Sequence, residues 1–180
     1  MSYDEYYVKS VIRTISDWPE PGIEFRDITP IFKDPKARRM VAHAFVQRYM
    51  DMNLSAIACI DARGFLFGSI IAHELNLPLV LVRKKGKLPG ECLHQEYTLE
   101  YGTASVEMQA DALEQGDRVV LIDDLIATGG TILAAMTLIK KLGGEVVEAA
   151  ALINLPDLGG ATKIQDAGSP VYTLLAFEGH

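Results

Sequence analysis

Short runs of almost continuous apolar residues alternate with helix-like segments along most of this chain, and this alternation is its strongest constraint on folding. The runs typical of buried strands are Ala56–Ile60, Leu79–Val82, Arg118–Ile122, Val146–Ile153 and Val171–Leu175. Phe65–Leu75 and Gly130–Leu142 lie between them and are spaced like amphipathic helices. The pattern predicts an α/β fold with a mostly parallel, twisted sheet flanked by helices. Such sheets bind ligands at the carboxyl ends of their strands.

The N-terminal part of the chain carries separate helix signals. Val8–Ile15 has helical spacing and stops before the prolines that follow Trp18. Asp34 and Pro35 form a helix opening, with a capping acid and a proline at the first helical position. We expect the helix that begins there to continue to about Met52.

The segment Lys84–Gly102 breaks the alternation because it is polar, rich in charge and glycine, and poor in apolar spacing. A connection this long in a compact fold is usually functional, often a mobile lid. Within residues 84–108 we expect a flexible loop and, over parts of Gln95–Met108, an antiparallel hairpin. No repeat or linker interrupts the chain, so we expect one domain over residues 1–180.

Composition narrows the possible partners and the compartment. The 180 residues carry a net charge of −7, which argues against general binding to nucleic acid or acidic membranes. A polyanionic ligand would therefore need a local basic cluster. No apolar stretch is long enough to span a bilayer, and the N-terminus lacks a secretory pattern. The two cysteines form no disulfide framework, so we expect a cytoplasmic protein.

The most informative segment, Val119–Thr131, joins a buried strand to two adjacent acids, a small-residue loop and a helix start. Glycines let backbone N–H groups approach an anion, and a helix N-terminus supplies unpaired donors. The loop and first helical residues that would bind a phosphate are Ala127, Thr128, Gly129, Gly130 and Thr131. Asp123 and Asp124 would repel a phosphate beside them, but one step away they could accept bonds from sugar hydroxyls or hold hydrated magnesium. The combination suits a ribose with a phosphate at one end.

The alternative for this segment is a capped helix after a turn with two solvated acids. The coincidence of the acid pair, the Thr-Gly-Gly-Thr loop and the preceding strand favours the phosphate site. Two other phosphate motifs, the P-loop and the Gly-x-Gly-x-x-Gly fingerprint after a strand, are absent from the sequence.

The segment resembles the phosphoribosyl pyrophosphate (PRPP) signature of the type I phosphoribosyltransferases. Further segments narrow the resemblance to the adenine-specific members: Pro21–Ile28, Ala62–Gly68, Arg83–Gly90 and Leu99–Gly102. The resemblance covers essentially the whole chain. It implies the type I fold, with a small N-terminal hood over about residues 1–33 that binds the purine.

The resemblance also implies how pyrophosphate is bound. Arg63 and Gly64 follow the first buried strand, and Arg83, Lys84 and Lys87 belong to the densest positive cluster of an acidic chain. Without that role, Arg63 would be a surface arginine paired with Asp61, and the lysines would form a solvated loop. The family carries an unusual cis peptide, expected here at Ala62–Arg63. Asp61 stands where many relatives have glutamate.

The base-binding residues follow from the resemblance alone. Adenine would be held by the hood and by two residues near the strand ends: Ile23, Phe25, Arg26, Ile126 and Leu155. As an alternative, Phe25 and Leu155 are core residues. Glu100 is the implied acid or base near N7 of the purine, and Tyr101 closes the loop. Ala127 replaces the aspartate that oxopurine-specific relatives place before Thr-Gly, which favours adenine.

The expected reaction converts adenine and PRPP into AMP and pyrophosphate, as part of purine salvage, with Mg²⁺ carried by PRPP and held in part by Asp123 and Asp124. Glu100, Arg63 and Lys87 are the expected catalytic residues. The resemblance implies a homodimer in which part of the lysine cluster reaches the neighbouring site. Two alternatives remain open: another purine as acceptor, and a PRPP-sensing regulator without catalysis. His43, His73, His94 and His180 lack metal-ligand spacing.

Overall fold

A seven-stranded sheet forms the centre of the computed structural model, which describes residues 3–99 and 102–179. Its strands are β3 (Ala56–Ile60), β4 (Leu79–Lys84), β5 (Cys92–Leu99), β6 (Gly102–Gln109), β7 (Arg118–Ile126), β8 (Glu145–Asn154) and β9 (Val171–Ala176). Their order is β5-β6-β4-β3-β7-β8-β9. The five strands from β4 to β9 in this order pair in parallel, whereas β5 and β6 form an antiparallel hairpin on the β4 edge. The predicted α/β fold, its parallel sheet and the hairpin are confirmed.

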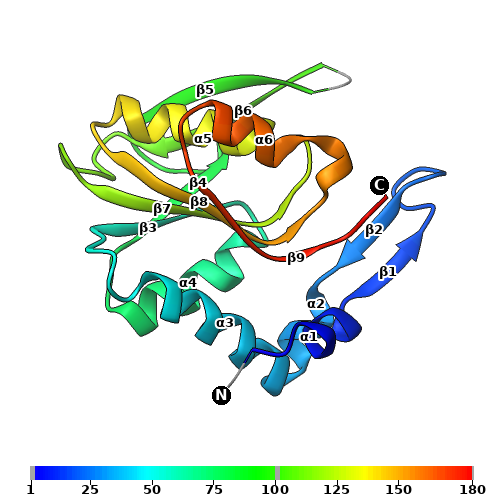
Figure 1. Ribbon diagram of the computed structural model, residues 1–180. Helices are drawn as coiled ribbons and strands as arrows, with labels where there is room; N and C mark the ends of the chain where they lie inside the picture. The colour runs from blue at the N-terminus through cyan, green and yellow to red at the C-terminus, as the bar shows by residue number, and fades with distance from the viewer. Residues whose placement is uncertain (1–2, 100–101, 180) are drawn as a thin grey trace.

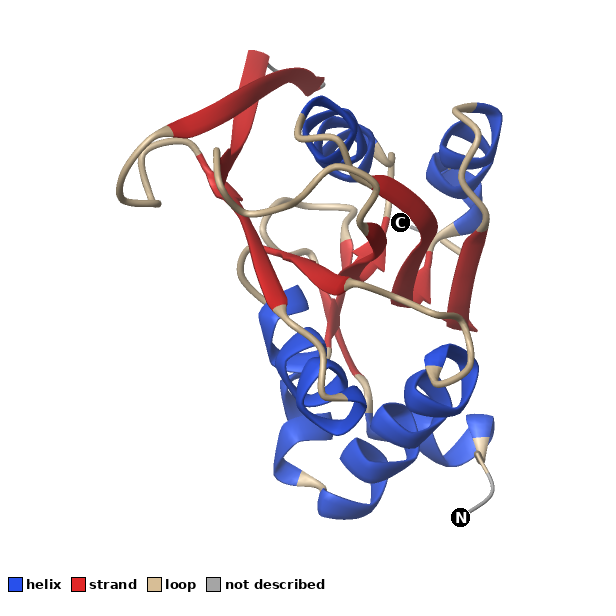
Figure 2. Ribbon diagram, turned by 90° about the vertical axis from the view of Figure 1, so that its left-hand side faces the viewer, coloured by secondary structure: helices blue, strands red, loops and turns tan. Residues whose placement is uncertain are grey.

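Helices cover both faces of this sheet (Figures 1 and 2). One face packs against α1 (Glu5–Val11), α2 (Thr29–Lys33), α3 (Pro35–Tyr49) and α4 (Gly64–Leu75); the other packs against α5 (Gly130–Lys141) and α6 (Gly160–Asp166). The burial of all five side chains of β3 shows that both layers exclude water from the central strand. None of the helices in the described part of the chain combines the length and apolar character that a bilayer span requires.

The helix starts follow the sequence signals. Asp34 caps α3, because its side chain accepts hydrogen bonds from the N–H groups of Lys36 and Ala37. Pro35 occupies the first helical position, as predicted. A short 3-10 helix, η1 (Pro156–Leu158), and α6 follow β8, where the sequence pattern did not predict a helix.

The prediction of a helix over Val8–Ile15 is wrong at its C-terminal end. The helix stops at Val11, and residues Arg13–Ser16 form strand β1, which pairs antiparallel with β2 (Glu24–Asp27). Arg13 also forms an ion pair of 2.7 Å with the Asp27 carboxylate. Pairing with a partner more distant in sequence therefore overrides the local helical spacing. This two-stranded hood stands apart from the main sheet, beside the C-terminal segment (Figure 1).

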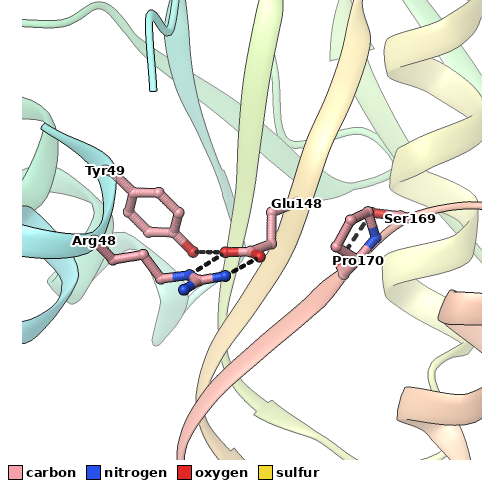
Figure 3. A network of polar contacts seen from close by, with 5 residues as sticks. All are labelled: Arg48, Tyr49, Glu148, Ser169 and Pro170. Atoms are coloured by element: carbon pink, nitrogen blue, oxygen red, sulfur yellow. Dashed lines mark hydrogen bonds and ion pairs between the residues drawn. The ribbon is translucent and has the colours of Figure 1, made fainter. Parts of the chain in front are cut away.

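A buried carboxylate fastens α3 to the sheet at the end remote from the strand carboxyl termini (Figure 3). Glu148 of β8 is 2% exposed and accepts two hydrogen bonds from the Arg48 guanidinium, at 2.6 and 2.7 Å. It also accepts one from the Tyr49 hydroxyl at 2.8 Å. All of these donors lie on α3, so one acid satisfies several buried polar groups between two elements.

We predict that Glu148→Ala lowers the free energy of unfolding by about 2–3 kcal/mol, because the buried Tyr49 hydroxyl and Arg48 lose their acceptor. Urea unfolding measures the change. Glu145→Ala on the same strand is the control: Glu145 is 66% exposed and its pair with Arg118 is 3.4 Å long, so its loss should cost under about 1 kcal/mol. Equal losses in both variants would contradict the assignment.

Candidate active site

Two parallel strands end side by side and deliver the charged groups of the candidate site. β3 and β7 pair from Ala56 opposite Val119 to Cys59 opposite Ile122, so the residues beyond them meet at one sheet edge. A cavity of about 190 Å³ lies there. Its lining includes the polar side chains of Asp61, Arg63, Lys84, Tyr97, Asp123, Asp124 and Thr131. The structure therefore brings the predicted acid pair, Arg63, one lysine and one threonine of the loop to a single cavity.

The loop after β7 presents free backbone donors at the start of α5. Gly129 has φ of +82° and caps the helix without a side-chain hydrogen bond, so the first N–H groups of α5 have no side-chain partner among the described residues. A helix N-terminus of this kind favours an anion. The N–H of Gly160, at the start of α6, donates to the Ala127 carbonyl at 3.1 Å and so links α6 to the loop.

Glycine is required where these two backbones touch. A Cβ atom on Gly160 would lie 2.2 Å from the Ala127 carbonyl oxygen, and one on Gly129 would lie 3.0 Å from the Gly160 carbonyl oxygen. Both contacts are with backbone atoms that a side-chain rotation cannot relieve. Sequence reasoning identified Gly129 but missed Gly160, because no local pattern connects α6 to the loop.

The two acids of β7 differ in environment. Asp124 is 5% exposed and its Oδ2 lies 2.8 Å from Nε of Arg63. Asp123 is half-buried and its Oδ1 accepts a hydrogen bond from the Asp124 backbone N–H at 2.8 Å. Burial raises the pKa of the Asp123 carboxyl well above its usual range, the Asp124 charge raises it further, and Arg63 offsets only part of this. The site thus holds two acids in close proximity, and ionisation of one disfavours ionisation of the other.

Arg63 joins the acid pair to the hood. Its guanidinium carbon lies 5.1 Å from the centre of the Phe25 ring, a cation–π contact, while Nε faces Asp124. The alternative that Arg63 pairs with Asp61 is wrong, because Asp61 accepts a hydrogen bond from Arg83 at 3.0 Å. The expected cis peptide is also misplaced by one residue: the cis bond joins Asp61 to Ala62.

Gly64 allows α4 to begin directly against β7. A Cβ atom there would lie 2.9 Å from the Ile122 carbonyl oxygen and 3.1 Å from Cα of Asp123. A larger residue would push the helix start, and Arg63 with it, away from the acid pair. The position of Gly64 beside the acids fits its predicted place in the site.

The basic cluster is divided between the cavity and the surface. Lys84 lines the cavity, and Arg83 reaches the Asp61 carboxylate. Lys87 is exposed on the following turn, where its carbonyl accepts a hydrogen bond from Arg83 at 3.2 Å. The structure therefore does not bring the Lys87 side chain into the same cavity.

The residues expected to bind the base lie in several different environments. Phe25 contacts Trp18 edge-on and Arg63 through its face. Arg26 points towards the C-terminal segment, where its guanidinium lies 4.8 Å from the Phe177 ring centre. Ile126 and Leu155 are buried and are joined by a backbone hydrogen bond of 2.9 Å, whereas Ile23 is 37% exposed. Glu100 and Tyr101 lie outside the described residues.

Sequence reasoning missed Tyr97, which closes the site from β5. Its ring would lie 3.2 Å from a Cβ atom on Gly130, and its hydroxyl accepts a hydrogen bond from Thr131 at 3.2 Å. The available signal was the alternation along the hairpin, since Leu93, Gln95 and Tyr97 all face α5 or the core beneath it. The hairpin therefore contributes a residue that contacts the start of α5.

Comparisons with known proteins agree with this geometry. The family model of the phosphoribosyl transferase domain matches residues 27–169, so the chain belongs to the phosphoribosyltransferase family. Within that family it is similar to the adenine phosphoribosyltransferase of Marinomonas sp. strain MWYL1, 58% identical over 179 residues and 99% of each chain.

Solved structures of adenine phosphoribosyltransferases share the fold over nearly the whole chain. That from Thermoanaerobacter pseudethanolicus superposes with a TM-score of 0.93 at 44% identity, covering 97% of this chain and 100% of the other. That from Trypanosoma brucei, in complex with AMP, pyrophosphate and ribose-5-phosphate, gives a TM-score of 0.88 at 33% identity, covering 98% and 82%.

We predict that Asp123→Asn raises the melting temperature at neutral pH, because it removes one of two crowded acids and keeps an acceptor for the Asp124 N–H. An acid with a raised folded pKa binds more protons in the folded state than in the unfolded chain. Its contribution to the free energy of unfolding therefore falls as pH rises from the unfolded pKa, about 3.9, towards the folded pKa.

The difference between Asp123→Asn and wild type should accordingly shrink as the pH is lowered towards 4. Thermal unfolding across that range measures it. An Asp123→Asn protein that is less stable than wild type at neutral pH would show that the acid pair is not under repulsion.

Proposed function

We propose that this protein transfers the 5-phosphoribosyl group of PRPP to adenine, giving AMP and pyrophosphate in purine salvage. The observation that carries the proposal is the meeting of an acid pair, a glycine loop at a helix N-terminus and Arg63 around one cavity. The identity of 58% to an adenine phosphoribosyltransferase supports it, as does the complex of the T. brucei relative with AMP and pyrophosphate.

Ribose and its 5′-phosphate occupy the loop and the acid pair in this proposal. The backbone N–H groups and hydroxyls of residues 127–131 bind the phosphate, and Asp123 and Asp124 accept hydrogen bonds from the ribose hydroxyls. Rate enhancement then comes mainly from positioning and from stabilising charge.

Pyrophosphate leaves towards the cations. Arg63 and Lys84 line the cavity, with the N–H of Gly64 at the start of α4, and Arg83 and Lys87 are the next cations outward. The adjacent carboxylates of Asp123 and Asp124 form an oxygen donor set that fits Mg²⁺, whose other ligands would come from PRPP and water. When bound, the metal neutralises the charge that develops on the leaving group.

Adenine binds between the hood and the strand ends in this proposal. Phe25 lies beside Arg63, and Ile23, Arg26, Ile126 and Leu155 are the other residues proposed to contact the base. Ala127 offers no carboxylate to N7, so Glu100 supplies the acid or base, and Tyr101 closes the loop over the bound substrates. Closure excludes water that would otherwise hydrolyse PRPP.

The enzyme is proposed to act as a cytoplasmic homodimer. An apolar groove of about 800 Å³ lies between α3 and α4 and includes Phe32, Val46 and Leu66, of which Leu66 is 43% exposed. α4 begins at the pyrophosphate residues, so a second copy seated there would bring two sites close together. The free thiols of Cys59 and Cys92 are compatible with a reducing compartment.

A panel of bases tests the reaction. Incubated with PRPP and magnesium, the protein should convert adenine to AMP with release of pyrophosphate, and should convert hypoxanthine and guanine far more slowly. Chromatography of the nucleotides and a pyrophosphate assay measure both products. Preferential use of an oxopurine, or PRPP binding without any turnover, would refute the proposed function.

The double variant Asp123→Asn/Asp124→Asn should lower kcat/KM by about 10³-fold or more, because both acceptors for the ribose hydroxyls lose their charge. Its circular dichroism spectrum should match that of wild type, since neither change alters side-chain volume. Arg118→Ala, which removes an exposed cation from the opposite end of β7, is the control and should keep wild-type activity. A double variant with near-normal activity would overturn the roles given to both acids.

A further inference from the structure

Glu107 of β6 is a buried acid that the proposed mechanism does not use. The residue is 2% exposed, and its Oε1 accepts hydrogen bonds from the backbone N–H groups of Lys87 and Leu88, both at 2.7 Å. Its Oε2 lies 3.3 Å from Nδ1 of His94. Burial raises the pKa of Glu107, but hydrogen bonds from the N–H groups of Gly86, Leu88 and Lys87 lower it more, so the net pKa is lowered.

These bonds fix a turn that has few other restraints. Lys84, Lys85 and Lys87 are exposed and carry like charges within one short turn, which favours their separation. The Lys85 N–H donates to the Ser105 carbonyl, and beyond it the Glu107 carboxylate supplies the acceptor for successive N–H groups. A buried charge under the turn thus offsets the repulsion and sets the backbone geometry.

The turn is also linked to the candidate active site. Arg83 lies opposite Glu107 in the β4–β6 pairing and donates from Nη1 to the Lys87 carbonyl at 3.2 Å. From Nε it donates to Asp61, which lines the cavity with Arg63 and Lys84. Displacement of the turn would therefore reach the cavity through Arg83 as well as through the lysines themselves.

We propose that Glu107 is a positioning residue for the pyrophosphate end of PRPP: its carboxylate holds the backbone of residues 86–88 so that Arg83, Lys84 and Lys87 stay close to the leaving group. The inference rests on the proposed function, since it assigns this turn to pyrophosphate. Glu107 touches no substrate and acts through the turn. Its loss should weaken binding of PRPP and pyrophosphate and leave adenine binding intact.

Two substitutions separate the acceptor from the charge. In Glu107→Ala the turn loses its acceptor, and KM for PRPP and the inhibition constant of pyrophosphate should each rise about tenfold, with KM for adenine within about twofold of wild type. In Glu107→Gln the amide oxygen can still accept from the N–H groups of Lys87 and Leu88, so most of the PRPP affinity should return. Steady-state kinetics and calorimetric titration with magnesium pyrophosphate measure both.

Glu148→Gln is the matched control, because it removes an equally buried carboxylate charge on β8, opposite Val120 near the start of β7. It should lower the melting temperature and leave KM for PRPP unchanged. A folded Glu107→Ala protein with wild-type KM for PRPP, or with an equal rise in KM for adenine, would overturn the inference. So would a rise in KM for PRPP in Glu148→Gln as large as that in Glu107→Ala.

Glu107→Asp covers the case in which Glu107→Ala fails to fold. The shorter side chain keeps the charge but withdraws the oxygens from the turn, so its KM for PRPP should exceed that of Glu107→Gln; the reverse order would refute the inference. Wild-type turnover of PRPP and adenine is measured first. Its absence would refute the proposed function, whereas normal wild-type turnover with unchanged variants would refute the role of Glu107 alone.

Discussion

The parallel pairing of β3 with β7 is the constraint on which the candidate site depends. It places the turn after Ile60 beside the acids of β7, and the absent side chain of Gly64 lets α4 start against the β7 backbone, with its Cβ position 2.9 Å from the Ile122 carbonyl oxygen. Arg63 can reach Asp124 only because these two backbones approach so closely. A wider spacing between strand and helix would leave the same residues at the same edge without contact.

The cations of the site are held by acids. Arg63 faces Asp124, Arg83 faces Asp61, and the lysine turn rests on Glu107. In a chain of net charge −7, this arrangement keeps positive charge ordered at one edge of the sheet. In the proposed function, pyrophosphate would compete with Asp124 for Arg63, and its binding would free the Asp124 carboxylate for the ribose hydroxyls. The same ion pair would then link occupation of the two parts of the site.

The features that local sequence determines were predicted well, and those that depend on distant partners were not. The strand Ala56–Ile60 was predicted from a local apolar run, and the Asp34 cap from an acid followed by proline. β4 extends beyond the predicted Val82 to Lys84 because β6 pairs with its end, and β7 continues past Ile122 because β8 accompanies it to Asn154. Where pairing with another strand determines the end of a strand, the local sequence does not predict that end.

The site shows the same division. The acid pair and the glycine loop could be predicted because they follow one another in the sequence, directly after a buried strand. The partner of Arg63 could not, since the choice between Asp61 and Asp124 depends on which helix start approaches which strand. Tyr97 and Gly160 reach the loop from the hairpin and from α6, and no spacing rule connects them to residues 127–131. Glu107 was missed for the same reason, because the N–H groups that donate to its carboxylate lie on the turn between β4 and β5.

The Glu148 network and the candidate site lie at opposite ends of the central sheet. At the carboxyl ends, the two acids of β7 are crowded, which raises the pKa of Asp123, and glycines let the backbones of residues 127–129 and 160 approach closely. At the other end, Glu148 satisfies Arg48 and Tyr49 in a fully paired network between α3 and β8. β8 is continuous from this network to Asn154, which pairs with Ile126 at the end of β7. The same sheet therefore carries a buried acid with its partners at one end and a crowded acid pair at the other.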